Sequence, residues 1–150
     1  MHVSNPDAVA CGPALLTGWR LEFFGPSKRW HGSPASIAPS SSGHEREDCV
    51  AGVLWSIRDL APLDRQEESY EAISVNVTRL LPSDHPGSVI TCRTYQRERR
   101  PGYTVGLPSR TLKRVMITGA EEHALPHWFL EKLTRLRDNG DESPPQLSAV

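Results

Sequence analysis

The chain has 150 residues, the usual length of one folded domain and enough to bury a hydrophobic core. Hydrophobic residues make up 37% of it, and its 13 Pro and 11 Gly residues indicate a loop-rich α+β protein rather than a helical bundle. The formal net charge of −1 creates no overall field that attracts nucleic acid or an acidic membrane surface. We therefore expect small-molecule partners, and neither nucleic acid nor membrane.

The cysteines and the N-terminal residues indicate the cellular compartment of the protein. Cys11, Cys49 and Cys92 are widely spaced and form no C-x-x-C pair, so neither a disulfide framework nor a zinc site is expected. The first residues lack the pattern of a signal peptide, and no stretch approaches the roughly 20 apolar residues of a spanning helix. We expect a cytoplasmic protein.

The first half of the chain contains three candidate strands. Residues 18–24 alternate large apolar side chains with Arg20 and Glu22, which is typical of a half-buried strand. Residues 32–47 are rich in Ser, Pro and Gly and indicate a loop, with a short strand over 35–38. Residues 49–57 form a continuous apolar run, which predicts a strand that is buried on both faces at the centre of the sheet.

The second half contains a hairpin, two helices and a tail. Residues 73–78 and 89–95 alternate in the manner of paired strands. The segment 97–102 after them, with a basic cluster that contains Glu98, indicates a solvated loop. Ser109 is expected to cap a helix, and Pro126 to begin another. The apolar stripes of these helices are Leu112, Val115, Met116 and Gly119, and Phe129, Leu130, Leu133 and Leu136. Residues 141–150 predict a disordered tail, so the domain is expected to span residues 1–140.

Glu67 is the candidate for proton transfer. Asp59 is expected to cap a short helix on which Leu60, Leu63 and Glu67 share one face, with Asp64 on the solvated side. A carboxylate at the edge of an apolar face loses solvation, which raises its pKa toward the range of a general acid or base. The alternative is a capped or ion-paired Glu at a helix end.

Tyr70 and Tyr95 lie at the beginning and the end of strands near this helix, where a phenolic O–H can orient a polar ligand. The alternative for both tyrosines is ordinary packing on a half-buried sheet. His123 and His127 stand four apart, but no acidic third ligand accompanies them, so we do not expect a metal site.

Taken in order, seven segments resemble the γ-glutamylcyclotransferase family over roughly residues 5–137. They are Asn5-Pro6, the strand Leu21-x-Phe23, Trp30-His31-Gly32, Gly52-Val53-Leu54-Trp55, Leu63-Asp64-Arg65-Gln66-Glu67, Ile90-Thr91-Cys92-Arg93-Thr94-Tyr95, and Gly119-Ala120 followed by Leu125-Pro126.

The resemblance implies a mixed, barrel-like β-sheet flanked by helices, a homodimer, and no metal or organic cofactor. It also implies the release of 5-oxoproline from γ-glutamyl amino acids, a lyase or acyltransferase-type cyclisation in glutathione metabolism. Glu67 matches the catalytic glutamate of the family. Tyr70 and Tyr95 match tyrosines of its substrate pocket.

The chain departs from the family pattern in places. It does not contain the Tyr-Gly-Ser-Asn-Leu turn that presents backbone N–H groups to the substrate in the family, and Leu112 stands where the family usually has a tyrosine. These departures predict feeble activity in this form. They leave two alternatives open, a non-catalytic binding member of the family and a related cyclotransferase that acts on γ-glutamylamines or glutathione.

Overall fold

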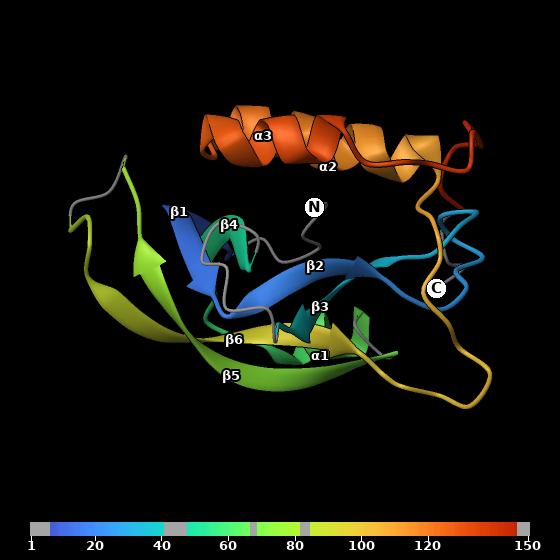
Figure 1. Ribbon diagram of the computed structural model, residues 1–150. Coiled ribbons are helices and arrows are strands. Elements are labelled where there is room, and N and C mark those ends of the chain that lie inside the picture. The colour runs from blue at the N-terminus through green and yellow to red at the C-terminus, as the bar shows by residue number, and fades with distance from the viewer. Residues whose placement is uncertain (1–6, 41–47, 67–68, 82–84, 147–150) are drawn as a thin grey trace.

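A computed structural model describes residues 7–40, 48–66, 69–81 and 85–146 (Figure 1). Within these residues the chain forms six strands and three helices. In chain order they are β1 (Val9–Thr17), β2 (Trp19–Phe23), β3 (Ala35–Pro39), β4 (Cys49–Ser56), α1 (Ala61–Gln66), β5 (Tyr70–Arg79), β6 (Val89–Arg97), α2 (Arg110–Glu122) and α3 (His127–Thr134).

The strands form two antiparallel sheets. The larger sheet has the order β4-β1-β5-β6, and β2 pairs with β3 in a separate two-stranded sheet. The predicted α+β class, the strands near residues 18–24 and 35–38, and the hairpin of β5 and β6 are confirmed. The barrel-like closure is not, because the described strands form two open sheets.

Strand β1 was not expected from the sequence and occupies an interior place in the larger sheet. It pairs with β4 along its length and with β5 through Ala14 and Leu15. The strand was not predicted because it contains Gly12 and Pro13, and such residues usually interrupt strands. Gly12 has a φ of 103°, and the register with β4 shifts between Ala10 and Gly12, so a local irregularity accommodates both residues.

Strand β4 lies at the edge of the larger sheet, so its predicted central position is wrong. Its apolar run has another cause, because β4 contributes to two hydrophobic clusters. Leu54 packs against the first cluster, formed by Ala14, Leu16, Ile37, Val75 and Val77. Ala51 belongs to the second cluster, with Ala120, Phe129 and Leu133.

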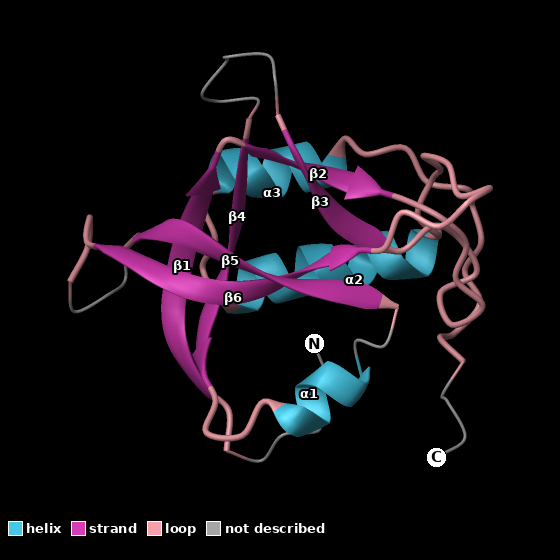
Figure 2. Ribbon diagram, turned by 90° about the horizontal axis from the view of Figure 1, so that it is seen from below, coloured by secondary structure: helices cyan, strands magenta, loops and turns pink. Residues whose placement is uncertain are grey.

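The helices lie on different sides of the strands. Helices α2 and α3 run side by side over one side, whereas α1 lies beside β5 and β6 (Figures 1 and 2). The predicted caps are confirmed, because Ser109 Oγ accepts a hydrogen bond from Leu112 N at 3.1 Å and Asp59 Oδ1 accepts one from Ala61 N at 3.0 Å. No helix in the described part of the chain is long and apolar enough to cross a membrane.

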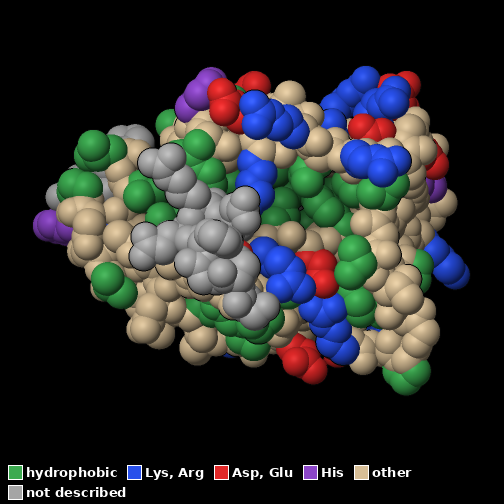
Figure 3. Space-filling view, viewed as in Figure 1, with side chains coloured by type: hydrophobic (Ala, Val, Ile, Leu, Met, Phe, Trp, Pro, Cys, Tyr) green, Lys and Arg blue, Asp and Glu red, His purple; other side chains and the backbone are tan. Residues whose placement is uncertain are grey.

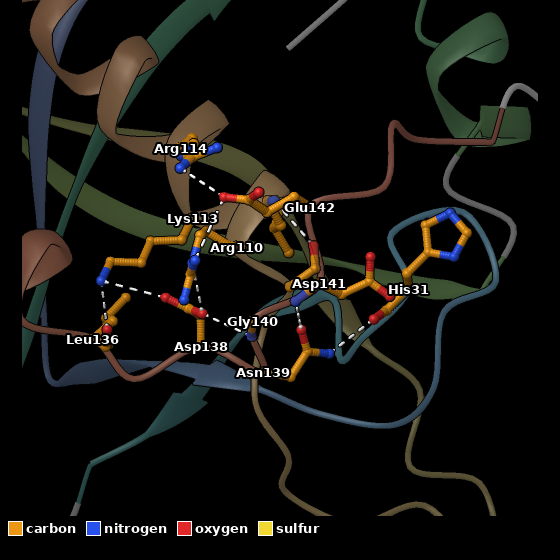
Figure 4. Close-up of polar contacts among 12 residues, drawn as sticks. His31, Arg110, Lys113, Arg114, Leu136, Asp138, Asn139, Gly140, Asp141 and Glu142 are labelled. Carbon is orange, nitrogen blue, oxygen red and sulfur yellow. Dashed lines mark hydrogen bonds and ion pairs between the residues drawn. The ribbon is translucent and has the colours of Figure 1, made fainter.

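The segment after α3 returns to the N-terminus of α2 (Figure 4). Asp141 O accepts hydrogen bonds from Arg110 N at 2.9 Å and from Thr111 N at 3.3 Å. These are two of the backbone donors that have no partner inside the helix. The carbonyl of Asp141 therefore acts together with Ser109 as a cap for α2.

Side chains add further links between this segment and the rest of the fold. Glu142 forms an ion pair with Arg114 at 2.8 Å, and Thr111 Oγ1 donates to Ser143 O at 2.9 Å. His31 Nε2 lies 3.2 Å from Pro144 O, and Gln146 N donates to Arg29 O at 2.9 Å. Residues 141–146, for which the sequence predicts a disordered tail, thus connect α2 to the loop after β2.

We expect removal of residues 141–150 to lower the free energy of unfolding by about 1–2 kcal/mol, the usual cost of losing a helix cap. The N–H groups of Arg110 and Thr111 would then have only water as a hydrogen-bond partner. Calorimetry should show a melting temperature lower by about 3–8 °C. A second truncation, which removes only residues 147–150, is the control and should melt like the intact chain. Equal melting temperatures for the two truncations would contradict this role of the segment.

Candidate functional site

The two candidate tyrosines lie on one face of the β5–β6 hairpin. Tyr70 pairs directly with Arg97, and Ala72 pairs with Tyr95. Directly opposed residues share a sheet face, as do residues two apart on a strand. One face of the hairpin therefore carries the side chains of Tyr70, Tyr95, Arg93 and Arg97. The opposite face carries the valines of β5 into the first hydrophobic cluster.

Tyr95 connects this face to helix α1. Its hydroxyl donates to Asp64 Oδ1 at 2.6 Å, and Arg93 Nη2 lies 3.0 Å from the same oxygen. The Arg93 guanidinium also lies 5.8 Å from the centre of the Tyr95 ring. Asp64 was expected on the solvated side of the helix, but it holds α1 against β6. Leu63, predicted to face inward, is buried.

Tyr70 is oriented by the two-stranded sheet. Its hydroxyl donates to Ala35 O at 2.9 Å, at the first residue of β3. Both tyrosines therefore use their proton within the protein, whereas the sequence suggested that they would donate it to a ligand. A phenolic oxygen also carries lone pairs, so toward a ligand each tyrosine offers an acceptor, which suits an ammonium or amide N–H.

Glu67 lies outside the described residues. The described chain reaches Gln66, the last residue of α1, and resumes at Ser69, one residue before β5. The neighbouring elements are thus the helix that carries Asp64 and the strand that begins with Tyr70. The assignment of Glu67 as the proton-transfer residue stays a prediction.

Arg97 lies on the same sheet face as the two tyrosines, but its position was predicted wrongly from the sequence. It was included in a solvated basic loop, but it ends β6 and is only 8% exposed. The sequence does contain a signal, because Arg93, Tyr95 and Arg97 continue the two-residue period of the strand. Arg99 lies beyond the strand and is exposed. It forms an ion pair at 2.6 Å with Glu22, whose side chain is buried.

Two cysteines and two histidines of the described chain lie away from the face that carries Tyr70 and Tyr95. Burial raises the pKa of the Cys49 and Cys92 thiols, which disfavours the nucleophilic thiolate. In the described ranges, no three His, Cys, Asp or Glu side chains are grouped to hold a metal ion. His127 instead lies 3.1 Å from Glu131 on α3, and His123 contacts the Trp55 ring edge-on.

Two surface hollows lie away from the tyrosines. One, of about 420 Å³, is lined by residues of α2 together with Glu142. The other, of about 280 Å³, lies on the side of β2 where Figure 3 shows hydrophobic side chains bordered by Lys and Arg. It is lined in part by Leu21, Leu107 and Leu136. Neither hollow includes Tyr70 or Tyr95, so both hollows lie apart from the face of β5 and β6 that carries these residues, the tyrosine face.

Comparison with known proteins gives a consistent result. The model of the AIG2-like family matches residues 49–133. The γ-glutamylcyclotransferases of Mus musculus and Bos taurus are each 34% identical to this chain over 145 residues, covering 93% of this chain and 72% of the relative. A solved structure named γ-glutamyl cyclotransferase has a TM-score of 0.81 and 30% identity, and the match covers 97% of this chain and 84% of that one. The resemblance inferred from the sequence is thereby confirmed, and the chain belongs to the AIG2-like family and, with these relatives, to the γ-glutamylcyclotransferases.

Proposed function

We propose that this protein converts γ-glutamyl amino acids into 5-oxoproline and the free amino acid. The observation that carries the proposal is the 34% identity, over 93% of the chain, to relatives named γ-glutamylcyclotransferase. The reaction needs an intramolecular attack and one group that moves a proton. A site with one carboxylate and polar side chains that hold the substrate is sufficient for it.

In the proposed mechanism Glu67 takes a proton from the substrate α-ammonium group. The free amine then attacks the γ-carbonyl carbon of the same molecule, which forms the C–N bond of the five-membered ring. The tetrahedral intermediate collapses and breaks the original γ-amide bond. Glu67 returns its proton to the departing nitrogen and then takes the second proton that the ring nitrogen must lose to become the lactam N–H. Glu67 passes this proton to the released amine, so the amino acid leaves as an ammonium ion, Glu67 is again a carboxylate and no net proton is consumed.

The substrate is held in this proposal by the tyrosine face of β5 and β6. The oxygens of Tyr70 and Tyr95 can accept hydrogen bonds from the substrate ammonium, since both hydroxyl protons are donated elsewhere. A folded-back γ-glutamyl chain has its amine beside its γ-carbonyl, and holding that conformation supplies much of the rate enhancement. The contact between Asp64 and Tyr95 orients the helix that precedes Glu67.

The test is the release of 5-oxoproline from a panel of substrates, measured by chromatography. γ-Glutamyl-alanine should be turned over, and γ-glutamyl-ethylamine and glutathione identify a related cyclotransferase if either is preferred. Substrate binding without release of 5-oxoproline would identify a non-catalytic binding protein and overturn the proposed function.

Two further properties follow from the family resemblance. We propose that the chain is a homodimer and that it acts in the cytoplasm, where γ-glutamyl compounds of glutathione metabolism are available. Light scattering at several protein concentrations tests the first property. A mass equal to one chain at all concentrations would contradict it.

A further inference from the structure

Arg97 is a buried cation held between aromatic rings. Its guanidinium carbon lies 5.4 Å from the centre of the Tyr70 ring and 5.3 Å from that of Tyr103. Nη2 donates to Pro26 O at 2.8 Å, and the backbone N donates to Ser36 Oγ at 2.9 Å. The two ring contacts and the Nη2 hydrogen bond hold the guanidinium in place at the end of β6.

The charge of Arg97 is not balanced by a carboxylate in the described part of the chain. Its Nε is buried and has no hydrogen-bond partner there. A buried charge without an opposite charge is costly, and buried polar atoms are nearly always hydrogen-bonded. The neighbouring Arg99 shows the usual solution, because it is paired with Glu22. Arg97 thus has the features of a site that is completed by an external anion.

The position of Arg97 connects its guanidinium to the tyrosine face. Arg97 pairs directly with Tyr70 across the hairpin and lies two residues after Tyr95 on the same face. The guanidinium is a donor, whereas the tyrosine oxygens can accept. Adjacent donors and acceptors match a group that has a carboxylate and an ammonium on one carbon. In a γ-glutamyl amino acid only the glutamyl end has both, because the nitrogen of the other residue is an amide.

We propose that Arg97 binds the α-carboxylate of the glutamyl part of the substrate. This inference rests on the proposed function for the identity of the ligand. Arg97 is then a substrate-binding residue that selects a free α-carboxylate beside the reacting amine. Guanidinium and carboxylate groups form strong charge-assisted hydrogen bonds, which make this selection effective.

The experiment uses two ligands that do not react and differ only in this group. 5-Oxoproline keeps the glutamyl carboxylate, and 5-oxoprolinamide replaces it with an amide. Dissociation constants are measured by NMR titration for the wild type and for Arg97→Met, which keeps a long apolar side chain. Arg97→Lys keeps the charge but not the planar donor set. Arg100→Met is the matched control. It removes an equal charge three residues after Arg97, where Arg100 forms an exposed ion pair with Glu98.

We expect the wild type and Arg100→Met to bind 5-oxoproline at least about tenfold more tightly than the amide, the usual contribution of a hydrogen bond to a charged group. Arg97→Met should lose this preference, and Arg97→Lys should retain part of it. The inference is overturned if the wild type has no preference, or if a folded Arg97→Met keeps it. If Arg97→Met does not fold, the inference is tested by the wild type and Arg97→Lys. A wild type without a preference, or an Arg97→Lys variant with the full wild-type preference, then overturns it.

A second comparison distinguishes the two carboxylates of the substrate. With γ-glutamyl-alanine and γ-glutamyl-ethylamine, Arg97→Met should raise KM equally, because both contain the glutamyl carboxylate. A rise for γ-glutamyl-alanine alone would assign Arg97 to the other carboxylate and overturn the proposal. The proposed function fails on a different result, namely that the wild type releases no 5-oxoproline from any substrate. The binding preference for 5-oxoproline over its amide is measured independently of that result.

Discussion

Replacing Glu67 with Gln should reduce the release of 5-oxoproline by about two to four orders of magnitude, the range that general acid–base catalysis contributes. The amide has nearly the shape of the carboxylate but cannot take a proton from the substrate ammonium. The protonated amine is not a nucleophile, so ring closure is blocked at its first step. The measurement is kcat/KM for γ-glutamyl-alanine, with product quantified by mass spectrometry to reach low rates.

The neighbouring residue provides the control for this substitution. Glu68→Gln makes the same chemical change one position further along the chain, where the sequence pattern predicts a side chain off the face expected for Leu63 and Glu67. It should keep activity within a few-fold of the wild type. Full activity of a folded Glu67→Gln variant would exclude Glu67 as the proton-transfer residue, and loss of activity only in Glu68→Gln would move the assignment by one residue.

Replacing Leu133 with Ala should lower the free energy of unfolding by about 2–5 kcal/mol, the cost of removing a fully buried leucine side chain. Leu133 is 1% exposed and joins Ala51, Ala120 and Phe129 in the cluster between β4 and the two long helices. The change leaves a cavity that these neighbours fill only in part. Urea denaturation should show a lower midpoint with an unchanged slope.

Thr134→Ala is the control for Leu133→Ala, because the exposed Thr134 lies next to Leu133 on the same helix. Its unfolding free energy should stay within about 0.5 kcal/mol of the wild type. If Leu133→Ala also falls in that range, the second cluster does not stabilise the domain as the burial indicates. Together the two variants separate packing from the intrinsic preference of the helix for Ala.

Sequence reasoning succeeded where a pattern depends on near neighbours. The alternation in β5 and β6, the cap at Ser109 and the apolar stripe of α3 each involve residues within a few positions of one another. It failed for β1, where Gly12 and Pro13 resemble a strand end although the sheet accommodates them. It also failed for the edge position of β4, because an apolar run reports burial and not the number of strands that pair beside it.

The candidate site also has a part that the sequence predicted and a part that only the tertiary structure shows. Tyr70 and Tyr95 could be chosen from their positions in strands and their match to a family motif, since both are local properties of the chain. The contacts that define their chemistry join distant segments: Tyr95 meets Asp64 across 31 positions, and Arg97 meets Pro26 across 71. No local period encodes such pairs, because they depend on how the hairpin crosses α1, β3 and the loop after β2. The burial of Arg97, and with it the proposed carboxylate site, follows from that packing.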